Sequence, residues 1–136
     1  MPERDTRPEI ERIKERRDGL DVLDDLLAAA TAGGYAALTA EQVQLAKWWG
    51  VYPQRPEESG LLMLRVRVPN GALTSPQLRA IGELSVRYGR SLADITTRQC
   101  IQLHSLRVED LPAIFAALDA VGLTSAQACG DVWRNV

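Results

Sequence analysis

Residues 61–68 alternate aliphatic side chains with larger or charged ones, and this pattern constrains the fold more than any other part of the chain. A β-strand places successive side chains on opposite faces of its sheet. One face of this strand therefore carries only aliphatic residues, and the other carries Met63, Arg65 and Arg67. The sequence predicts a sheet with one buried face and one face that presents guanidinium groups.

A helix is expected after this strand, over residues 76–88. Thr74 is a suitable N-cap, Pro76 suits the first helical position, and Gly89 is expected to end the helix. The expected buried stripe of this helix consists of Leu78, Ile81, Leu84 and Val86.

The elements that follow complete an α+β pattern. Short strands are expected over residues 92–96 and 100–106, a second helix begins near Asp110, and residues 123–129 form one more strand or an extended edge. The order strand, helix, strand, strand, helix, strand is the split βαβ, or ferredoxin-like, arrangement. We therefore expect an antiparallel sheet with helices on one face.

Residues 1–42 are expected to form an N-terminal helical arm that precedes a domain over residues 43–136. Charged side chains dominate residues 1–19, and too few apolar residues are present there to bury a helix, so this part is expected to be frayed or solvated. Leucines at helical spacing predict a short amphipathic helix over residues 20–31.

The stretch before the alternating strand combines a helix and a loop. Thr39-Ala40-Glu41-Gln42 has the pattern of a capping box and starts a helix that ends at Gly50. Residues 49–60 include two prolines among polar side chains, which favours an extended loop over any regular element.

Composition limits the class of protein. The apolar and charged fractions, 46% and 25%, are those of a soluble globular domain, and a net charge of -2 gives no sign of a nucleic-acid partner. Cys100 and Cys129 are too few for a disulfide framework or for the four thiolates of a zinc or iron-sulfur site. No apolar run reaches the roughly 20 residues of a membrane span, and the charged start of the chain is unlike a signal peptide. We expect a cytoplasmic protein that binds neither membrane nor nucleic acid.

Polar residues concentrate in residues 95–104, a β-prone stretch where burial alone would favour aliphatic side chains. They include the only histidine of the chain and are Arg98, Gln99, Gln102 and His104. Together with Arg65, Arg67 and Arg134, they predict a positive, multidentate site for carboxylates or another oxyanion. A single arginine is usually a solvated charge, and a lone histidine on a strand is more often structural than a ligand. Two arginines on one sheet face favour a binding role.

Several motifs, in a fixed order and at matching spacings, carry a resemblance to a known family. They are Lys47-Trp-Trp-Gly-Val-Tyr52, Met63-Leu-Arg-Val-Arg-Val-Pro-Asn-Gly71, Gln77-Leu78, Tyr88-Gly89, Ile95-Thr-Thr-Arg-Gln99, Ile101-Gln-Leu-His104, Val121-Gly-Leu-Thr124 and Gly130-Asp-Val-Trp-Arg-Asn-Val136. From about residue 43 onward, the chain resembles the N-terminal ferredoxin-like half-domain of the sirohaem-dependent nitrite and sulfite reductases.

The resemblance implies a six-electron reduction of sulfite to sulfide, or of nitrite to ammonia, at a sirohaem coupled to a 4Fe-4S cluster, with an electron donor such as ferredoxin. It implies catalytic roles for Arg65 and Arg134, which match arginines that meet the substrate. The cofactor-binding residues that it implies are Arg67, Arg98, Gln99, Gln102, His104 and Asn135. Arginines suit a cofactor rich in carboxylates and an anionic substrate, because they hold their charge at every working pH.

The chain departs from the family pattern in three respects. Cys100 stands where the family usually has asparagine or threonine, and Trp133 replaces a smaller or polar residue. The chain also ends at Val136, before the second half-domain and the cluster-bearing cysteines. We therefore expect part of a longer enzyme that alone is inactive and holds neither the cluster nor a closed sirohaem. The apolar face that the C-terminal half would cover predicts self-association.

Other interpretations stay open at the level of sequence. A precorrin-3B synthase-like enzyme shares the half-domain and acts on a corrinoid precursor. A non-catalytic structural or partner-binding half-domain is a further alternative. An RNA-binding module would need aromatic side chains on its central strands, and residues 61–68 and 100–106 contain none.

Overall fold

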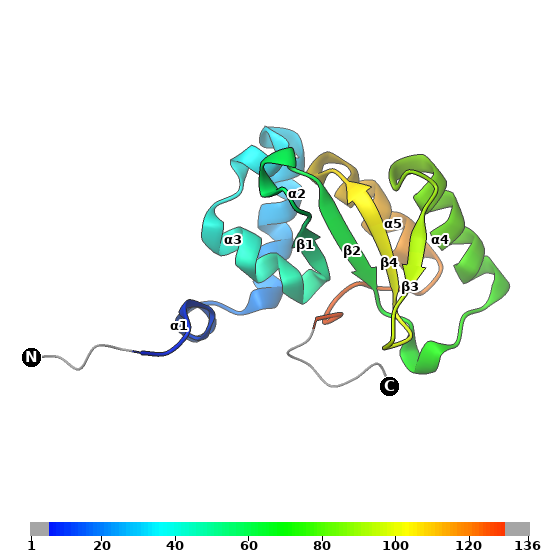
Figure 1. Cartoon of the computed structure of the whole chain (residues 1–136), viewed down its shortest axis with the longest axis horizontal. Helices are drawn as coiled ribbons and strands as arrows, with labels where there is room; N and C mark the ends of the chain where they lie inside the picture. The colour runs from blue at the N-terminus through cyan, green and yellow to red at the C-terminus, as the bar shows by residue number, and fades with distance from the viewer. Residues whose placement is uncertain (1–5, 130–136) are drawn as a thin grey trace, which may run out of the picture.

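The structure, a computed structural model, describes residues 6–129, and its centre is the strand predicted from the alternating pattern. Strand β2 (Leu62–Val66) lies between β1 (Val51–Pro53) and β4 (Ile101–Leu106), and β3 (Ala93–Ile95) forms the far edge (Figure 1). The strands are antiparallel to their neighbours in the order β1-β2-β4-β3. The predicted ferredoxin-like α+β arrangement is confirmed.

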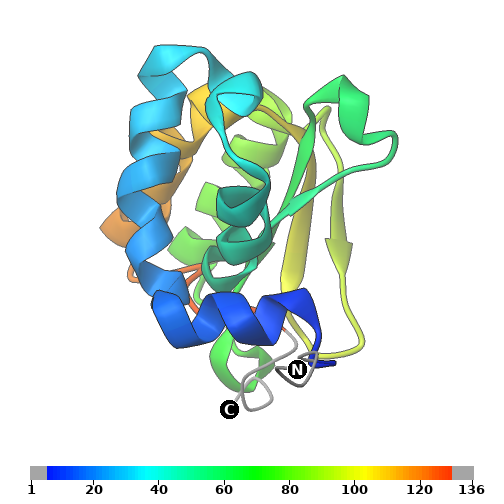
Figure 2. The same cartoon turned by 90° about the vertical axis from the view of Figure 1, so that its left-hand side faces the viewer.

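The helices pack on one face of this sheet. These are α2 (Val22–Ala32), α4 (Ser75–Tyr88) and α5 (Leu111–Ala120), with the shorter α3 (Ala40–Leu45) beside α2. Figure 2 shows α2 and α5 on one side of the molecule and the strands on the other. The aliphatic face of β2 is fully covered, since Leu64 is 0% exposed. The opposite face, with Met63 and Arg65, is only half-buried.

Capping residues set where two of the helices begin. The Thr74 hydroxyl accepts a hydrogen bond from the Gln77 backbone N–H, and the Gln77 side chain accepts one from the Thr74 N–H. Thr39 and Gln42 form the same reciprocal pair ahead of α3. Both predicted helix starts are confirmed, because each pair satisfies two N–H groups that have no partner within the helix.

The predicted buried stripe of α4 is correct in its centre and wrong at both ends. Ile81 and Leu84 are buried, whereas Leu78 and Val86 are 57% and 68% exposed. The face that meets the sheet also contains Ser85, which is buried. Val86 lies five residues from Ile81, so a period of 3.6 residues turns it away from that face.

The loop predicted over residues 49–60 is wrong for residues 51–53, which form β1. Val51 pairs with Leu64 and Tyr52 with Met63. Pro53 is compatible with this strand because β1 is at the edge of the sheet, where a missing N–H removes no essential ladder bond. At the other end of the chain, the predicted strand or edge over residues 123–129 is reduced to a single bridge between Thr124 and Arg67.

One edge of β2 is therefore shared by two segments that lie far apart in the sequence. The Arg65 N–H donates to the Gly50 carbonyl, and the Arg67 N–H donates to the Thr124 carbonyl, each at 2.8 Å. Gly50 has a φ of +70°, and a Cβ there would lie 2.5 Å from the Arg65 oxygen and 3.0 Å from the Ser125 oxygen. Only glycine fits where β1, β2 and the bridge segment meet.

The N-terminal segment contains the expected helix, α1 (Glu9–Arg16), but it is not a fully solvated arm. Ile13 is 1% exposed and belongs to the same apolar core as Leu26 of α2. Ile10, which is partly buried, packs against the same core, so one face of this otherwise charged helix is attached to the domain. Among the helices within residues 6–129, none combines the length and the apolar character needed to cross a membrane.

Candidate cofactor and anion site

Arg65 of β2 and Gln102 of β4 are direct cross-strand partners on the half-buried face of the sheet. When the Gln102 amide oxygen faces the guanidinium, it accepts hydrogen bonds from Arg65 Nη2 at 3.0 Å and from Nε at 3.3 Å. This orientation is assigned because it satisfies both groups, whereas the opposite one pairs donors with donors. The Arg65 Nη1 also donates to the Ala128 carbonyl at 3.4 Å. The Arg65 guanidinium carbon lies 5.4 Å from the Tyr52 ring centroid. Arg65 is thus held from three directions.

His104 extends this polar row along β4. Its Nε2 atom lies 2.7 Å from the Asp94 Oδ2 atom of β3, and Asp94 is itself the cross-strand partner of Gln102. The imidazole Nε2 atom therefore faces a carboxylate oxygen of the neighbouring strand, and this contact positions the ring beside Gln102.

A β-bulge interrupts the pairing of β4 next to His104. The register between β2 and β4 shifts between Leu62 and Leu64, and Ser105 has a φ of +61°. The Ser105 N–H leaves the ladder and donates to the Gln54 side-chain oxygen instead. Bulges bend a strand and re-aim its side chains, and this one follows directly after His104.

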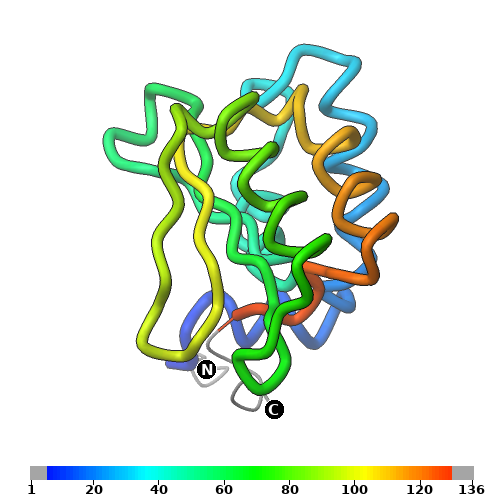
Figure 3. The backbone as a smooth tube through the Cα atoms, turned by 90° about the vertical axis from the view of Figure 1, so that its right-hand side faces the viewer, coloured from blue at the N-terminus to red at the C-terminus, as the bar shows by residue number. Residues whose placement is uncertain are grey.

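The other predicted site residues lie at the end of the sheet or outside the described part. Arg67 is half-buried and follows Arg65 on the same strand face. Arg98 is exposed in the β3–β4 turn. Gln99, with a φ of +63°, places its side chain against Gly71, and Figure 3 shows this turn at the same end of the molecule as the turn after β2. Arg134 and Asn135 lie outside the described residues.

Sequence reasoning missed two residues of this cluster. Tyr52 was assigned to a loop because of the prolines that follow it, although Val51 in the core and Tyr52 on the other face fit a two-residue strand pattern. Asp94 was given no role, since only the register of β3 against β4 brings it to Gln102 and His104. A single charged residue on a short edge strand carries no signal of its own.

The cluster is chemically suited to anions rather than to a bare metal ion. Its Arg65 guanidinium and Gln102 amide offer N–H donors, which suit carboxylates and oxyanions. Within residues 6–129 no three His, Cys, Asp or Glu side chains gather in a way that could hold a metal ion. Cys100 and Cys129 are both buried free thiols.

A separate pocket of about 450 Å³ borders Tyr52 on the side away from Arg65's strand and is also lined by Tyr35, Lys47 and Glu57. Burial raises the pKa of the Tyr35 hydroxyl above its ordinary value of 10.0, and the negative charges of Glu57 and Glu58 raise it further. Tyr35 is therefore neutral over the whole ordinary pH range.

Comparison with known proteins gives one consistent result. The family model of the nitrite/sulfite reductase ferredoxin-like half domain matches residues 54–121. The ferredoxin–nitrite reductase of Leptolyngbya laminosa is 42% identical over 127 residues, which are 93% of this chain and 25% of that protein. The sulfite reductase (ferredoxin) of Mycobacterium tuberculosis is 33% identical over 142 aligned positions, covering 93% of this chain and 26% of that protein.

A solved structure agrees with these sequences. The NirA protein of Mycobacterium tuberculosis has a TM-score of 0.82 at 32% identity, over 89% of this chain and 25% of that chain. The chain spans about a quarter of the length of the curated relatives it matches. The sheet order agrees with these matches, and the chain belongs to the nitrite and sulfite reductase family, as a ferredoxin-like half domain.

Proposed function

We propose that this chain supplies one wall of the sirohaem and anion site of a reductase that converts sulfite to sulfide or nitrite to ammonia. The observation that carries the proposal is the cluster of Arg65, Gln102 and His104 on the half-buried sheet face. The relatives' names, which are those of nitrite and sulfite reductases, support the class of reaction. Ferredoxin, named in both relatives, is the proposed electron donor. Residues 43–136 are the proposed half-domain.

The residues present fit an acidic tetrapyrrole. His104 lies on the same sheet face as Gln102, with its Nε2 atom held 2.7 Å from the Asp94 carboxylate. With its oxygen turned to Arg65, the Gln102 amide presents its two N–H donors elsewhere. Carboxylates on the cofactor would accept from these groups and from arginine side chains.

In this proposal Arg65 and Arg134 meet the substrate anion. Arg65 holds a permanent positive charge, since its guanidinium does not lose a proton. Because Gln102, Tyr52 and the Ala128 carbonyl fix it, little reorganisation is needed as negative charge develops on the substrate. The proposed cofactor contacts come from Arg67, Arg98, Gln99, Gln102, His104 and Asn135.

Electrons are supplied by the sirohaem and its 4Fe-4S cluster when they are bound. This chain's own residues do not fit the cluster, because its two cysteines are fewer than the four thiolates that such a cluster needs. In the proposal the chain therefore binds the sirohaem, orients the substrate anion and neutralises its charge, and the cluster ligands come from outside this chain.

The proposal is tested by co-expressing this chain with the remaining part of the Leptolyngbya laminosa reductase and titrating sirohaem into the complex. We expect a shift of the Soret absorbance that needs both parts and weakens at least tenfold in apparent affinity, or about 1.4 kcal/mol, in Arg65→Ala. Arg79→Ala removes an exposed arginine of α4 on the helical side and is the matched control.

Two results would contradict the proposal. If the complex assembles and shows no Soret shift, the sheet face is not a tetrapyrrole site. If Arg65→Ala and Arg79→Ala behave alike, Arg65 has no special role. Cofactor binding without reduction of sulfite or nitrite would favour the corrinoid-precursor enzyme instead.

A further inference from the structure

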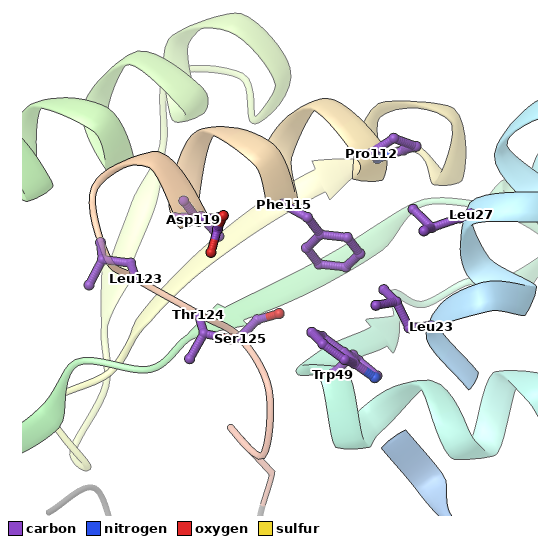
Figure 4. Close-up of a pocket in the computed structure, with 10 residues that line it drawn as sticks. Leu23, Leu27, Trp49, Pro112, Phe115, Asp119, Leu123, Thr124 and Ser125 are labelled. Atoms are coloured by element: carbon purple, nitrogen blue, oxygen red, sulfur yellow. The ribbon is translucent and has the colours of Figure 1, made fainter. Parts of the chain in front are cut away.

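On the helical side of the sheet, away from Arg65, α2 and α5 enclose a second pocket of about 480 Å³ (Figure 4). Most of its wall is apolar and comes from Leu23, Leu27, Trp49 and Phe115. The Trp49 and Phe115 rings are 5.9 Å apart at an angle of 53°. A cavity of this size with aromatic walls is typical of sites for small organic molecules.

Ser125 places an unsatisfied polar atom in this apolar wall. The residue is 1% exposed, and within the described part of the chain its Oγ atom has no hydrogen-bond partner. Figure 4 shows the hydroxyl directed towards the space between Trp49 and Phe115. A buried hydroxyl without a partner costs about 1–3 kcal/mol, and native structures contain few of them. A ligand with a hydrogen-bonding group would remove this cost.

Asp119 places a negative charge at the wall of this pocket. It follows Phe115 by one helical turn on α5, lines the same pocket and is exposed. Its carboxylate forms no ion pair or hydrogen bond with any residue in the range 6–129. The Trp49 indole N–H is already satisfied by the Leu20 carbonyl, so that ring presents only its apolar and π surfaces. Aromatic faces and a carboxylate both favour a cation.

We propose that this pocket binds a small organic amine, with its apolar body between Trp49, Phe115 and the α2 leucines and its ammonium group near Asp119 and Ser125. The Ser125 hydroxyl would accept from the ammonium, which has donors only. The site lies on the opposite side of the sheet from the Arg65 cluster, so it is independent of the proposed reductase function.

Three probes with the same phenyl and two-carbon body test the charge preference: 2-phenylethylamine, 2-phenylethanol and 3-phenylpropionate. Each is titrated into the ¹⁵N-labelled chain, and amide shifts locate binding while calorimetry gives the dissociation constant. We expect shifts at Phe115 and Ser125, and an amine that binds roughly fivefold tighter than the carboxylate, as for a solvent-exposed charge pair.

Variants separate the two polar groups. Asp119→Asn should reduce the ratio between amine and carboxylate affinity to about one, and Ser125→Ala should weaken the amine by roughly three- to tenfold. Glu83→Gln removes an exposed carboxylate from α4 and should change nothing. Ser125→Ala removes an unsatisfied hydroxyl and should not unfold the chain, which circular dichroism checks. If Ser125→Ala did unfold the chain, the ratio of amine to carboxylate affinity in Asp119→Asn would still test the proposal.

The proposal is overturned if no probe shifts the Phe115 and Ser125 amides at millimolar concentration, as for a pocket that holds only water. It is also overturned if the carboxylate binds as tightly as the amine, or if the preference survives Asp119→Asn. Loss of sirohaem binding in the reconstituted reductase would leave this result unaffected, so the two proposals fail separately.

Discussion

Gln102 is the residue directly across the β2–β4 pair from Arg65, and its amide oxygen meets two nitrogens of the guanidinium at 3.0 and 3.3 Å. An oxygen that accepts from two nitrogens of one guanidinium lies near its plane, so this contact restrains the plane as well as the position of the group. The plane of the Arg65 guanidinium is thus restrained by a residue on a different strand. The register of β2 against β4 therefore sets the orientation of this cation.

Replacing Gln102 by leucine should release Arg65 without unfolding the sheet. The lost hydrogen bonds should lower the free energy of unfolding by about 1 kcal/mol. The Arg65 Nε–H group should also become mobile, because the Gln102 oxygen that accepts from it is gone. The measurement is the ¹⁵N heteronuclear Overhauser effect at Nε, which should fall in Gln102→Leu and remain high in Gln102→Glu. An unchanged effect in Gln102→Leu would show that Tyr52 and the Ala128 carbonyl suffice.

Replacing Gly50 by alanine should be far more damaging than replacing Gly122, although both have a positive φ, +70° and +73°. At Gly50 the new methyl group would lie 2.5 Å from the Arg65 backbone oxygen, whereas at Gly122 no atom of residues 6–129, apart from the adjacent residues, is within 4 Å. We expect losses of about 3 kcal/mol at Gly50 and about 1 kcal/mol at Gly122, measured by urea unfolding. Equal losses of unfolding free energy would mean that the positive φ, and not the close contact at Gly50, causes the destabilisation.

Truncating Ile13 to alanine should cost about 3 kcal/mol, because its side chain is 1% exposed and leaves a cavity in the core. Ile95, on the edge strand β3, is 82% exposed and provides the same chemical change in the opposite environment. Ile95→Ala should change stability by less than about 0.5 kcal/mol. Thermal unfolding of both variants gives the comparison. A small effect at Ile13 would mean that α1 is only loosely attached.

Tyr35 should make the fold sensitive to alkali. Its folded-state pKa is above the ordinary value of 10.0, chiefly through burial, so the unfolded chain loses this proton first. Its contribution is complete below pH 10 and is lost as the pH rises through the folded-state pKa. Tyr35→Phe should therefore flatten the fall in unfolding free energy above about pH 10. Glu57→Gln should flatten it less, since the Glu57 charge is a smaller cause of the shift than burial.

Sequence alone predicted the parts of the fold that depend on local pattern. Within residues 61–68, Leu62–Val66 form the central strand because one face of the pattern is wholly aliphatic, and Thr74 and Gln77 begin α4 through contacts three residues apart. Val86 was assigned to the core because apolar character was weighed without its exact angle around the helix. Ile13 was missed because its burial depends on partners that lie far along the chain.

The candidate site was predictable only as a set of residues. Arg65, Gln102 and His104 were named, through the resemblance or through the concentration of polar groups on one strand. Their contacts were not, since the partners are fixed by register: Asp94 reaches His104 only because β3 pairs with β4 as it does. The roles of all these site residues stay predictions, and Arg134 and Asn135 also lie outside the described residues.

The order of the strands limits how this sheet is able to grow. Among residues 6–129, β1 and β3 are its outer strands, and the β2 edge that faces β1 is already occupied by β1 and Thr124. In the part of the chain that the structure describes, the outer edge of β3 has no paired strand, and its three residues are all exposed. Asp94 sits in the middle of β3, and a charge there discourages indiscriminate strand addition. A polypeptide that extended this sheet at β3 by backbone pairing would have to accommodate the Asp94 carboxylate, whereas one that joined at β1 would meet Pro53, which lacks an N–H.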